Sequence, residues 1–301
     1  MSQNTSIKPA WIGVDWGTTN LRAYAMTEQG ELLDECCSEQ GMSSLEPCAY
    51  EAALRSLIAH WDLPNPCTIV ACGMVGSRQG WQEAPYRAVP CTAGTDSPVR
   101  VNHSGNDLNV WLIPGVKQND PADVMRGEET QIAGFLALND DWDGVICLPG
   151  THSKWVHVSA GEIVSFRTFM TGEVFQAIST QTVLKHSLSG EDWDHAAFET
   201  ALSDTLSRPE NLGSTLFSLR ASDLLHGQSS GTARARLSGC LIGAELAAAK
   251  PYWLGQRIAI IGNDRLCDLY SFSLSQQGIQ AERSEAGAIT RAGLVAAYLS
   301  L

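Results

Sequence analysis

A tight turn that follows an apolar strand carries the strongest chemical signal in the sequence. It lies in residues 15–20 and reads DWGTTN. Glycine lets a backbone approach a ligand closely, and the N–H groups of such a turn can bind phosphate oxygens together with threonine hydroxyls. The Asp15 carboxylate at the strand end can hold Mg²⁺, usually through water, beside those phosphates. The alternative is an Asx-type hairpin turn that binds nothing.

A second glycine–threonine turn, PGTHSK at residues 149–154, recurs at the matching place in a later segment. Two such turns favour a polyphosphate site, because a purely structural turn need not recur with glycine and threonine in register. Lys154 adds a cation for anionic oxygens, with a solvated strand lysine as the alternative. The candidate phosphate-binding residues are Gly17, Thr18, Thr19, Asn20, Gly150, Thr151, His152 and Lys154.

An acidic pair, Glu128 and Glu129, opens a predicted helix just before the second of these segments. One glutamate could act as a base for a substrate hydroxyl. The alternative is that both side chains only complement the helix dipole. Glu128 is slightly favoured over Glu129 as the catalytic residue, and the choice stays open.

A glycine-rich segment at residues 72–81, CGMVGSRQGW, follows a buried strand. Its exposed backbone donors and Arg78 suit a substrate carboxylate, which an arginine can bind through two parallel hydrogen bonds. Arg87 is a second candidate for that role, and an ordinary turn with a surface arginine is the alternative. The candidate substrate-binding residues are Gly76, Ser77, Arg78, Arg87 and Arg126.

The elements that must position these residues repeat along the chain. Residues 11–37 and 144–170 each predict three short antiparallel strands separated by glycine turns. Helices follow from apolar spacing, and short apolar runs predict further strands. The predicted helices cover residues 47–61, 128–138, 172–184, 232–249, 264–276 and 284–299, and the further strands cover residues 68–72 and 257–261.

Such a pattern predicts an α/β protein of two mixed domains with related topology, residues 1–139 and 140–301. Composition limits the function. Of 301 residues, 44% are hydrophobic, and the net charge of −13 argues against binding nucleic acid or an anionic membrane. Nine cysteines without a C-x-x-C pair indicate reduced thiols. The first ten residues show no apolar leader, and no membrane span is visible, so we expect a cytoplasmic protein.

Taken together, these residues resemble the superfamily of sugar kinases, Hsc70 and actin, whose members bind ATP in a cleft between two duplicated ribonuclease-H-like domains. The two turns look like its phosphate loops, and Gly262 and Asn263 in IAIIGND are similar to its adenosine motif. Within the superfamily, DWGTTNLRAY, GMVGSRQGW, PYRAVP, RGEETQ, LPGTHSKW and FMTGEVF resemble the 2-dehydro-3-deoxygalactonokinases. These motifs run from residue 12 to about residue 175.

The resemblance implies transfer of phosphate from ATP, with Mg²⁺ near Asp15, to the C6 hydroxyl of 2-dehydro-3-deoxy-D-galactonate. It implies Glu128 as the base and Arg78 as the residue that orients the substrate carboxylate. Two other functions stay open: an exopolyphosphatase-like hydrolase, and a regulator that binds ATP or a sugar acid without turnover. Leu148 stands where many superfamily members have an acidic residue, which argues against the hydrolase. The preferred C4 epimer and the oligomeric state stay open, with a homodimer as one option.

Overall fold

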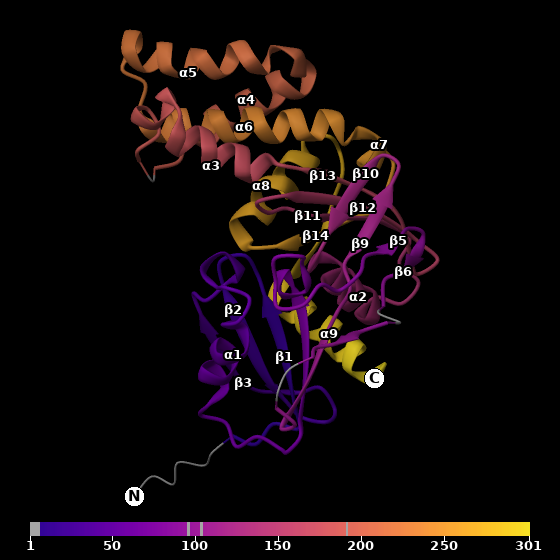
Figure 1. The fold of residues 1–301 in the computed structure, drawn as a ribbon. Coiled ribbons are helices and arrows are strands. Elements are labelled where there is room, and N and C mark those ends of the chain that lie inside the picture. The colour runs from indigo at the N-terminus through magenta and orange to yellow at the C-terminus, as the bar shows by residue number, and fades with distance from the viewer. Residues whose placement is uncertain (1–6, 95–96, 103–104, 191) are drawn as a thin grey trace, which may run out of the picture. The chain divides into compact units, whose positions relative to one another are not determined.

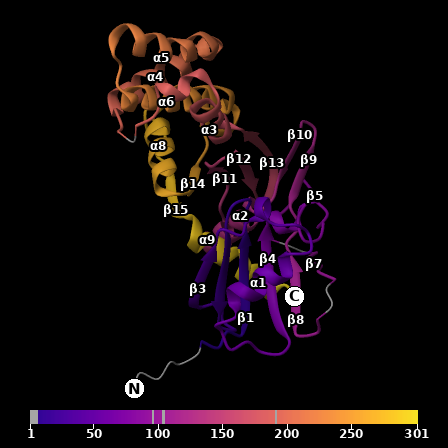
Figure 2. The ribbon, with the colours of Figure 1, turned by 60° about the vertical axis from the view of Figure 1, so that its left-hand side comes forward.

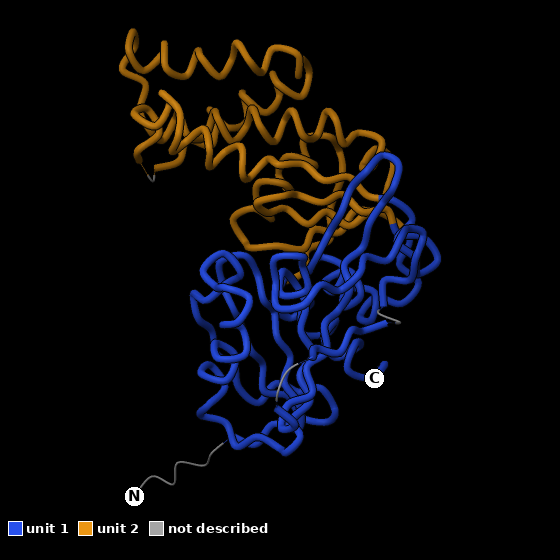
Figure 3. Tube along the Cα trace, viewed as in Figure 1, with its two compact units in different colours: residues 1–143, 158–165, 286–301 blue, residues 144–157, 166–285 orange. Residues whose placement is uncertain are grey.

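The computed structural model describes residues 7–94, 97–102, 105–190 and 192–301 (Figure 1). The expectation that the first ten residues form no apolar leader falls partly on residues 1–6, which lie outside the described residues. The chain divides into two compact units (Figure 3). Unit 1 comprises residues 1–143, 158–165 and 286–301, and unit 2 comprises residues 144–157 and 166–285. The domain boundary near residue 139 stays a prediction. Unit 1 also contains the last residues of the chain, 286–301.

A six-stranded mixed sheet forms the centre of unit 1, in the order β3-β2-β1-β4-β8-β7. Strand β1 runs antiparallel to β2 and parallel to β4, as three antiparallel strands followed by a crossover require. The strands are β1 (Trp11–Trp16), β2 (Leu21–Met26), β3 (Leu32–Ser38), β4 (Cys67–Gly73), β7 (Val99–Arg100) and β8 (Leu108–Leu112).

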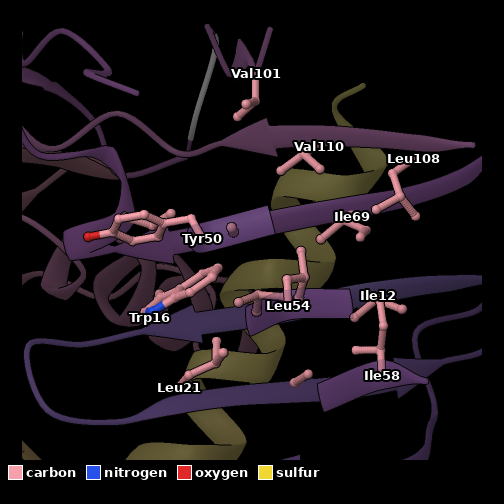
Figure 4. Packing of buried hydrophobic residues seen from close by; sticks show 14 of the residues in the cluster. Ile12, Trp16, Leu21, Tyr50, Leu54, Ile58, Ile69, Val101, Leu108 and Val110 are labelled. Carbon is pink, nitrogen blue, oxygen red and sulfur yellow. The ribbon is translucent and has the colours of Figure 1, made fainter. Parts of the chain in front are cut away.

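Side chains along β1 point alternately to the two faces of the sheet. Ile12, Val14 and Trp16 point into the cluster covered by α1 (Tyr50–Ile58), where the Trp16 and Tyr50 rings lie 5.0 Å apart (Figure 4). Trp11 belongs to the cluster on the opposite face. Because side chains alternate along a strand, Asp15 shares the face of Trp11.

Helix α9 (Ala286–Leu299) covers this second face, and α2 (Glu128–Leu138) packs against α9. They cross at glycines: a Cβ on Gly134 would lie 2.5 Å from the backbone nitrogen of Gly293. A Cβ on Gly293 would in turn overlap the carbonyl group of Thr130. The close crossing fixes α2, and therefore the acidic pair at its N-terminus, against α9.

Unit 1 also holds a three-stranded sheet in the order β10-β9-β5. Val116 pairs with Met125 on one side and with Arg87 on the other. Two candidate arginines therefore lie near one end of this sheet, Arg87 in β5 and Arg126 directly after β10. The strands are β5 (Arg87–Ala88), β9 (Val116–Asn119) and β10 (Ala122–Met125).

The third sheet has the order β15-β14-β11-β12-β13-β6. Its strands β13-β12-β11-β14-β15 repeat the arrangement β3-β2-β1-β4-β8 of unit 1, with β11 parallel to β14 and β14 parallel to β15. The predicted duplicated α/β fold is confirmed. The strands are β6 (Cys91–Thr92), β11 (Gly144–Leu148), β12 (Ser153–Ser159), β13 (Glu162–Phe169), β14 (Ile258–Gly262) and β15 (Glu282–Glu285).

Helices α3 to α6 form one group in unit 2, joined by contacts of α6 with α3, α4 and α5 (Figure 1 and Figure 2). Helices α4 and α5 were not predicted from the sequence. The predicted helix 172–184 ends at residue 181 and is followed by a 3-10 turn, and the predicted helix 284–299 starts later because residues 282–285 form β15. The helices of unit 2 are α3 (Thr171–Gln181), α4 (His195–Ser207), α5 (Leu212–His226), α6 (Ser230–Ala248), α7 (Lys250–Trp253) and α8 (Asp264–Ser275).

Across the described ranges, no helix is both long and apolar enough to cross a membrane.

Candidate active site

The first turn, residues 17–20, is stabilised by backbone hydrogen bonds from residues 41–43. The N–H groups of Gly41–Ser43 donate to the carbonyl oxygens of Gly17, Thr18 and Thr19 at 2.9–3.0 Å. With these carbonyl groups engaged, the N–H groups of Thr18 and Thr19 are left over; neither donates to a protein acceptor within the described part of the chain. The turn therefore keeps backbone donors that could bind an anion, and phosphate binding here stays a prediction.

Gly41 makes this arrangement possible. A Cβ at this position would overlap the backbone of both Thr18 and Thr19. The sequence did not single out Gly41, because its contact joins segments more than twenty residues apart. Its only local signal is one glycine in a polar stretch.

The second turn, residues 149–153, is supported in the same way by the start of α3. A Cβ on Gly172 would overlap the carbonyl group of Gly150, and the N–H of Glu173 donates to the carbonyl oxygen of Thr151 at 2.9 Å. The Glu173 carboxylate also lies 2.5 Å from Nε2 of His152. Each predicted phosphate turn is thus braced by a glycine from another segment.

Lys154 is buried rather than solvated: the residue is 3% exposed, and its Nζ donates to the carbonyl oxygen of His152 at 3.2 Å. The alternative of a solvent-facing strand lysine is therefore wrong. A buried cation beside the second turn adds positive charge where phosphate oxygens are expected.

Glu245 of α6 is a buried acid that the sequence analysis did not single out as a functional residue. It accepts hydrogen bonds from Nε1 of Trp155 at 2.8 Å and from the hydroxyl of Tyr270 at 2.7 Å. Tyr270 also lies 3.0 Å from Oγ of Ser153, the last residue of the second turn. Burial raises the pKa of Glu245, and hydrogen bonds including one from Thr171 oppose the rise. One carboxyl group thereby ties together β12, α8 and the start of α3.

A pocket of about 220 Å³ opens beside the second turn, within unit 2. Gly150 and Gly172 lie at one end, and apolar side chains from α3, α6 and α8 form its walls. The guanidinium of Arg234 lies over the Phe175 ring at 5.0 Å, and that of Arg265 over Trp193 at 5.3 Å. The remaining lining residues are Thr171, Ser238, Leu241, Ile242, Leu266, Leu269 and Tyr270.

The predicted adenosine motif lies next to this pocket. A Cβ on Gly262 would lie 3.3 Å from Pro149, so β14 ends against the second turn. The Asn263 side chain caps α8 by accepting from the N–H of Leu266 at 3.0 Å. Asn263 therefore starts the helix that supplies Arg265 and Leu266 to the pocket wall.

The acidic residues of unit 1 gather where β1 and β4 end. Gly73 has φ +89°, and Gly127 has φ +105° and packs on it: a Cβ on Gly127 would lie 3.4 Å from the Gly73 Cα. The start of α2 is thereby brought to Asp15, which is partly buried. Burial raises the pKa of Asp15, with Arg22 opposing the rise and the charge of Glu128 adding to it.

The two glutamates differ in their surroundings. Glu129 is 1% exposed, and its carboxylate accepts from the N–H of Gly127 at 2.6 Å and from Oγ1 of Thr130 at 3.0 Å. Burial and the neighbouring charge of Glu128 raise the pKa of Glu129 to about 7. Glu128 is partly exposed and accepts from the N–H of Arg126 at 3.0 Å. Glu128, rather than Glu129, therefore has access to a ligand.

Over the residues that the structure describes, no group of three or more His, Cys, Asp or Glu side chains is arranged to hold a metal ion. A single carboxylate that binds a hydrated ion needs no such group.

The candidate substrate-binding residues differ in how far they are exposed to solvent. The Arg78 side chain is 81% exposed, and its Nε lies 3.7 Å from Glu83. Arg87 and Arg126 each have two buried nitrogens without a hydrogen-bond partner. Ser77 is 5% exposed, and its Oγ lies 3.4 Å from Sδ of Met42, so this candidate faces the support of the first turn.

Comparison with known proteins gives the family. The model of the 2-keto-3-deoxy-galactonokinase family matches residues 15–297. A protein of Rhizobium meliloti (strain 1021) named as a 2-dehydro-3-deoxygalactonokinase is 37% identical over 95% of this chain and 96% of its own. The 2-dehydro-3-deoxygalactonokinase of Escherichia coli (strain K12) is 35% identical over 90% of this chain and 89% of its own.

Solved structures agree. The crystal structure of a 2-dehydro-3-deoxygalactonokinase protein from Sinorhizobium meliloti matches with a TM-score of 0.89 at 37% identity, covering 95% of this chain and 97% of that chain. Component A of the (R)-2-hydroxyglutaryl-CoA dehydratase of Acidaminococcus fermentans matches with a TM-score of 0.51 at 13% identity, covering 96% of both chains, which shows a shared fold alone. The chain belongs to the 2-keto-3-deoxy-galactonokinase family and is a kinase.

Proposed function

We propose that this protein transfers the terminal phosphoryl group of ATP to the C6 hydroxyl of 2-dehydro-3-deoxy-D-galactonate. The observation that carries the proposal is the pair of braced turns, since in each a glycine of another segment packs on the turn and the same segment donates an N–H to a carbonyl oxygen of the turn. Membership of the family supplies the substrate class.

Within unit 2, the nucleotide would bind in the pocket and at the second turn. Thr18 and Thr19 would donate to phosphate oxygens, as would the turn at Gly150 and Thr151, with Lys154 adding charge. The pocket beside Gly150 has apolar walls that suit a nucleobase and two arginines at its aromatic side chains. Gly262 and Asn263 would shape its wall rather than contact the base directly.

The carboxylates at the end of β1 fit a magnesium ion. Asp15 is held near the negative charge of Glu128, and a cation there would relieve the repulsion that helps to raise the pKa of Asp15. When bound, Mg²⁺ would neutralise charge on the transferring phosphoryl group. Asp15 would orient the hydrated ion through its carboxylate oxygens.

Glu128 is the residue that we assign as base for the C6 hydroxyl. Its partly exposed carboxylate lies in the first turn of α2. The buried Glu129 would instead hold the turn at Gly127 through its hydrogen bond to that N–H. Because phosphoryl transfer depends mainly on positioning and charge neutralisation, we expect the base to contribute less than Asp15.

The test is ADP release by the purified protein with MgATP, with and without 2-dehydro-3-deoxy-D-galactonate. The C4 epimer, D-galactonate and inorganic polyphosphate serve as alternative substrates. Release that requires the galactonate-derived keto acid is the expected result. Release without any sugar acid would instead identify a hydrolase, and ATP binding without release with any of these compounds would identify a non-catalytic binding protein.

A further inference from the structure

Arg126 is a buried cation with an incomplete set of partners. The residue is 8% exposed, and its Nη2 donates to the carbonyl oxygen of Ala84 at 2.8 Å. Its Nε and Nη1 are buried and have no hydrogen-bond partner. No salt bridge to Arg126 is found within the described ranges.

An unpaired buried guanidinium is costly, because it has lost water without gaining an opposite charge. The groups around it hold it in place without neutralising it. The Tyr86 ring lies under the guanidinium at 4.3 Å, and Tyr86 itself packs on Gly115. A Cβ on Gly76 would lie 2.9 Å from Nη1, so glycine keeps the space beside that nitrogen free of a side chain.

We propose that Arg126 binds the substrate carboxylate and makes the enzyme selective for sugar acids over neutral sugars. The inference rests on the proposed function and specifies how its substrate is recognised. Nη1 and the second N–H of Nη2 can form one edge of the guanidinium, the geometry that binds both oxygens of a carboxylate, and Nε–H is left for a further hydrogen bond.

The position of Arg126 along the chain fits a six-carbon acid. Arg126 and Glu128 are two residues apart on one turn, so their Cα atoms lie at most about 7 Å apart. An extended six-carbon chain spans about 6 Å from C1 to C6. The Glu128 carboxylate also lies 3.0 Å from the backbone nitrogen of Arg126, so the two residues are close enough for a six-carbon acid to reach both.

The other two arginines fit this role less well. Arg78 is largely exposed and lies near Glu83, so an ion pair there would be weak. Arg87 also has two buried nitrogens without partners, but its Nη1 already donates to the carbonyl oxygens of Thr92 and Gly94 at 3.0 and 2.5 Å. Arg87 is thus held by two hydrogen bonds to one loop, whereas Arg126 makes one, to Ala84.

The experiment compares Arg126→Met and Arg126→Lys with Arg78→Met, Arg87→Met and, as a control, Arg100→Met. Arg100 is exposed and donates to Asn109 at 2.6 Å. We measure KM and kcat for the keto acid and for its C1 amide, and the shift in Tm that each sugar acid causes.

Arg126→Met is expected to raise the KM for the keto acid about 10- to 100-fold, the effect of losing charge-assisted hydrogen bonds. The KM for the C1 amide should change far less. The KM of Arg126→Lys for the keto acid should lie between those of the wild type and Arg126→Met, because lysine keeps the positive charge but cannot form two parallel hydrogen bonds. The ligand-free Tm of Arg126→Met should not fall, since an uncompensated charge is removed. Arg100→Met should behave as the wild type.

A fall in ligand-free Tm with an unchanged KM ratio between acid and amide would show that Arg126 is structural, and would overturn the proposal. So would a larger rise in KM from Arg78→Met or Arg87→Met. The Tm shift separates this inference from the proposed function. If the wild type is stabilised by sugar acids but phosphorylates none, the reaction assignment fails, and loss of the shift in Arg126→Met still supports the carboxylate site.

Discussion

Gly41 lies so close to the carbonyl group of Thr18 that no side chain can be accommodated at position 41. Gly172 has the same relationship to Gly150 in the second turn. The neighbouring segment also donates three N–H groups to carbonyl oxygens of the first turn and one, from Glu173, to a carbonyl oxygen of the second. The two turns are therefore alike in their support as well as in their sequence.

Gly41→Ala should displace the first turn, because the new Cβ meets backbone that cannot rotate away. A shift of about 1 Å in a positioning group costs about 100-fold in rate, so we expect kcat/KM to fall by about that factor. ADP release measures it. The matched control is Gly213→Ala in α5, where a Cβ meets nothing within 4 Å and helix stability should rise slightly. Equal activity of the two variants would contradict the role assigned to Gly41.

Asp15→Asn should abolish turnover, with kcat lowered more than about 100-fold, because a group that orients charge in the transition state is lost. The fold should persist, and the ligand-free Tm near neutral pH should rise, since burial disfavours the charged Asp15. Steady-state kinetics and thermal unfolding provide the two measurements. Asp62→Asn is the control, because it removes only an exposed ion pair with Lys8. Near-normal kcat in Asp15→Asn would exclude Asp15 from the chemistry.

Glu129 should make the stability of the protein depend on pH. Its pKa is raised from 4.5 to about 7, so the folded state binds this proton more tightly than the unfolded state does. The free energy of unfolding should therefore fall as pH rises from about 4.5 to about 7, by about 3 kcal/mol in all. Glu129→Gln keeps an oxygen to accept from Gly127 and an amide to donate to Thr130, but it does not titrate.

The Tm of Glu129→Gln should thus match the wild type near pH 4.5 and exceed it at about pH 8. Thermal unfolding across this range checks the difference between the two proteins, which cancels the contribution of Asp15. A lower Tm for the variant at the alkaline end would show that the charged form is the one that the fold stabilises.

Glu245→Leu should destabilise unit 2, because it leaves Nε1 of Trp155 and the hydroxyl of Tyr270 buried without their acceptor. Two such groups cost about 2–4 kcal/mol in the free energy of unfolding. Glu199→Leu on the exposed part of α4 is the control and should change stability by less than about 0.5 kcal/mol. Urea unfolding compares the two, and a similar loss in both would contradict the buried network.

The features that could be predicted from the sequence are those formed by residues close together along the chain. The three-strand units, the helix that starts at Glu128 and the two glycine–threonine turns all follow from local spacing. The brace at Gly41 and the acceptor at Glu245 depend on contacts between distant segments, which no local pattern reports. Helix α5 was missed because its apolar residues lie on more than one face: Leu219 is buried, while Phe217 and Leu225 are 68% and 75% exposed.

The sequence alone also does not distinguish between the three candidate arginines. Arg78, Arg87 and Arg126 are equally suitable by residue type, and only their burial and hydrogen bonds in the fold separate them. Arg78 follows a glycine-rich turn that leaves it in solvent, whereas Arg126 follows β10 and is covered by Tyr86 and Ala84.

The crossing of α2 and α9 through Gly134 and Gly293 has a consequence for biosynthesis. Unit 1 begins with the first strands of the chain, but one face of its sheet is covered by residues 286–299. During translation, the strands β1 to β8 leave the ribosome long before that helix exists. Until synthesis is nearly complete, the Trp11 face of the sheet has no α9 to cover it, so a nascent chain is most exposed to aggregation and to chaperones in this interval.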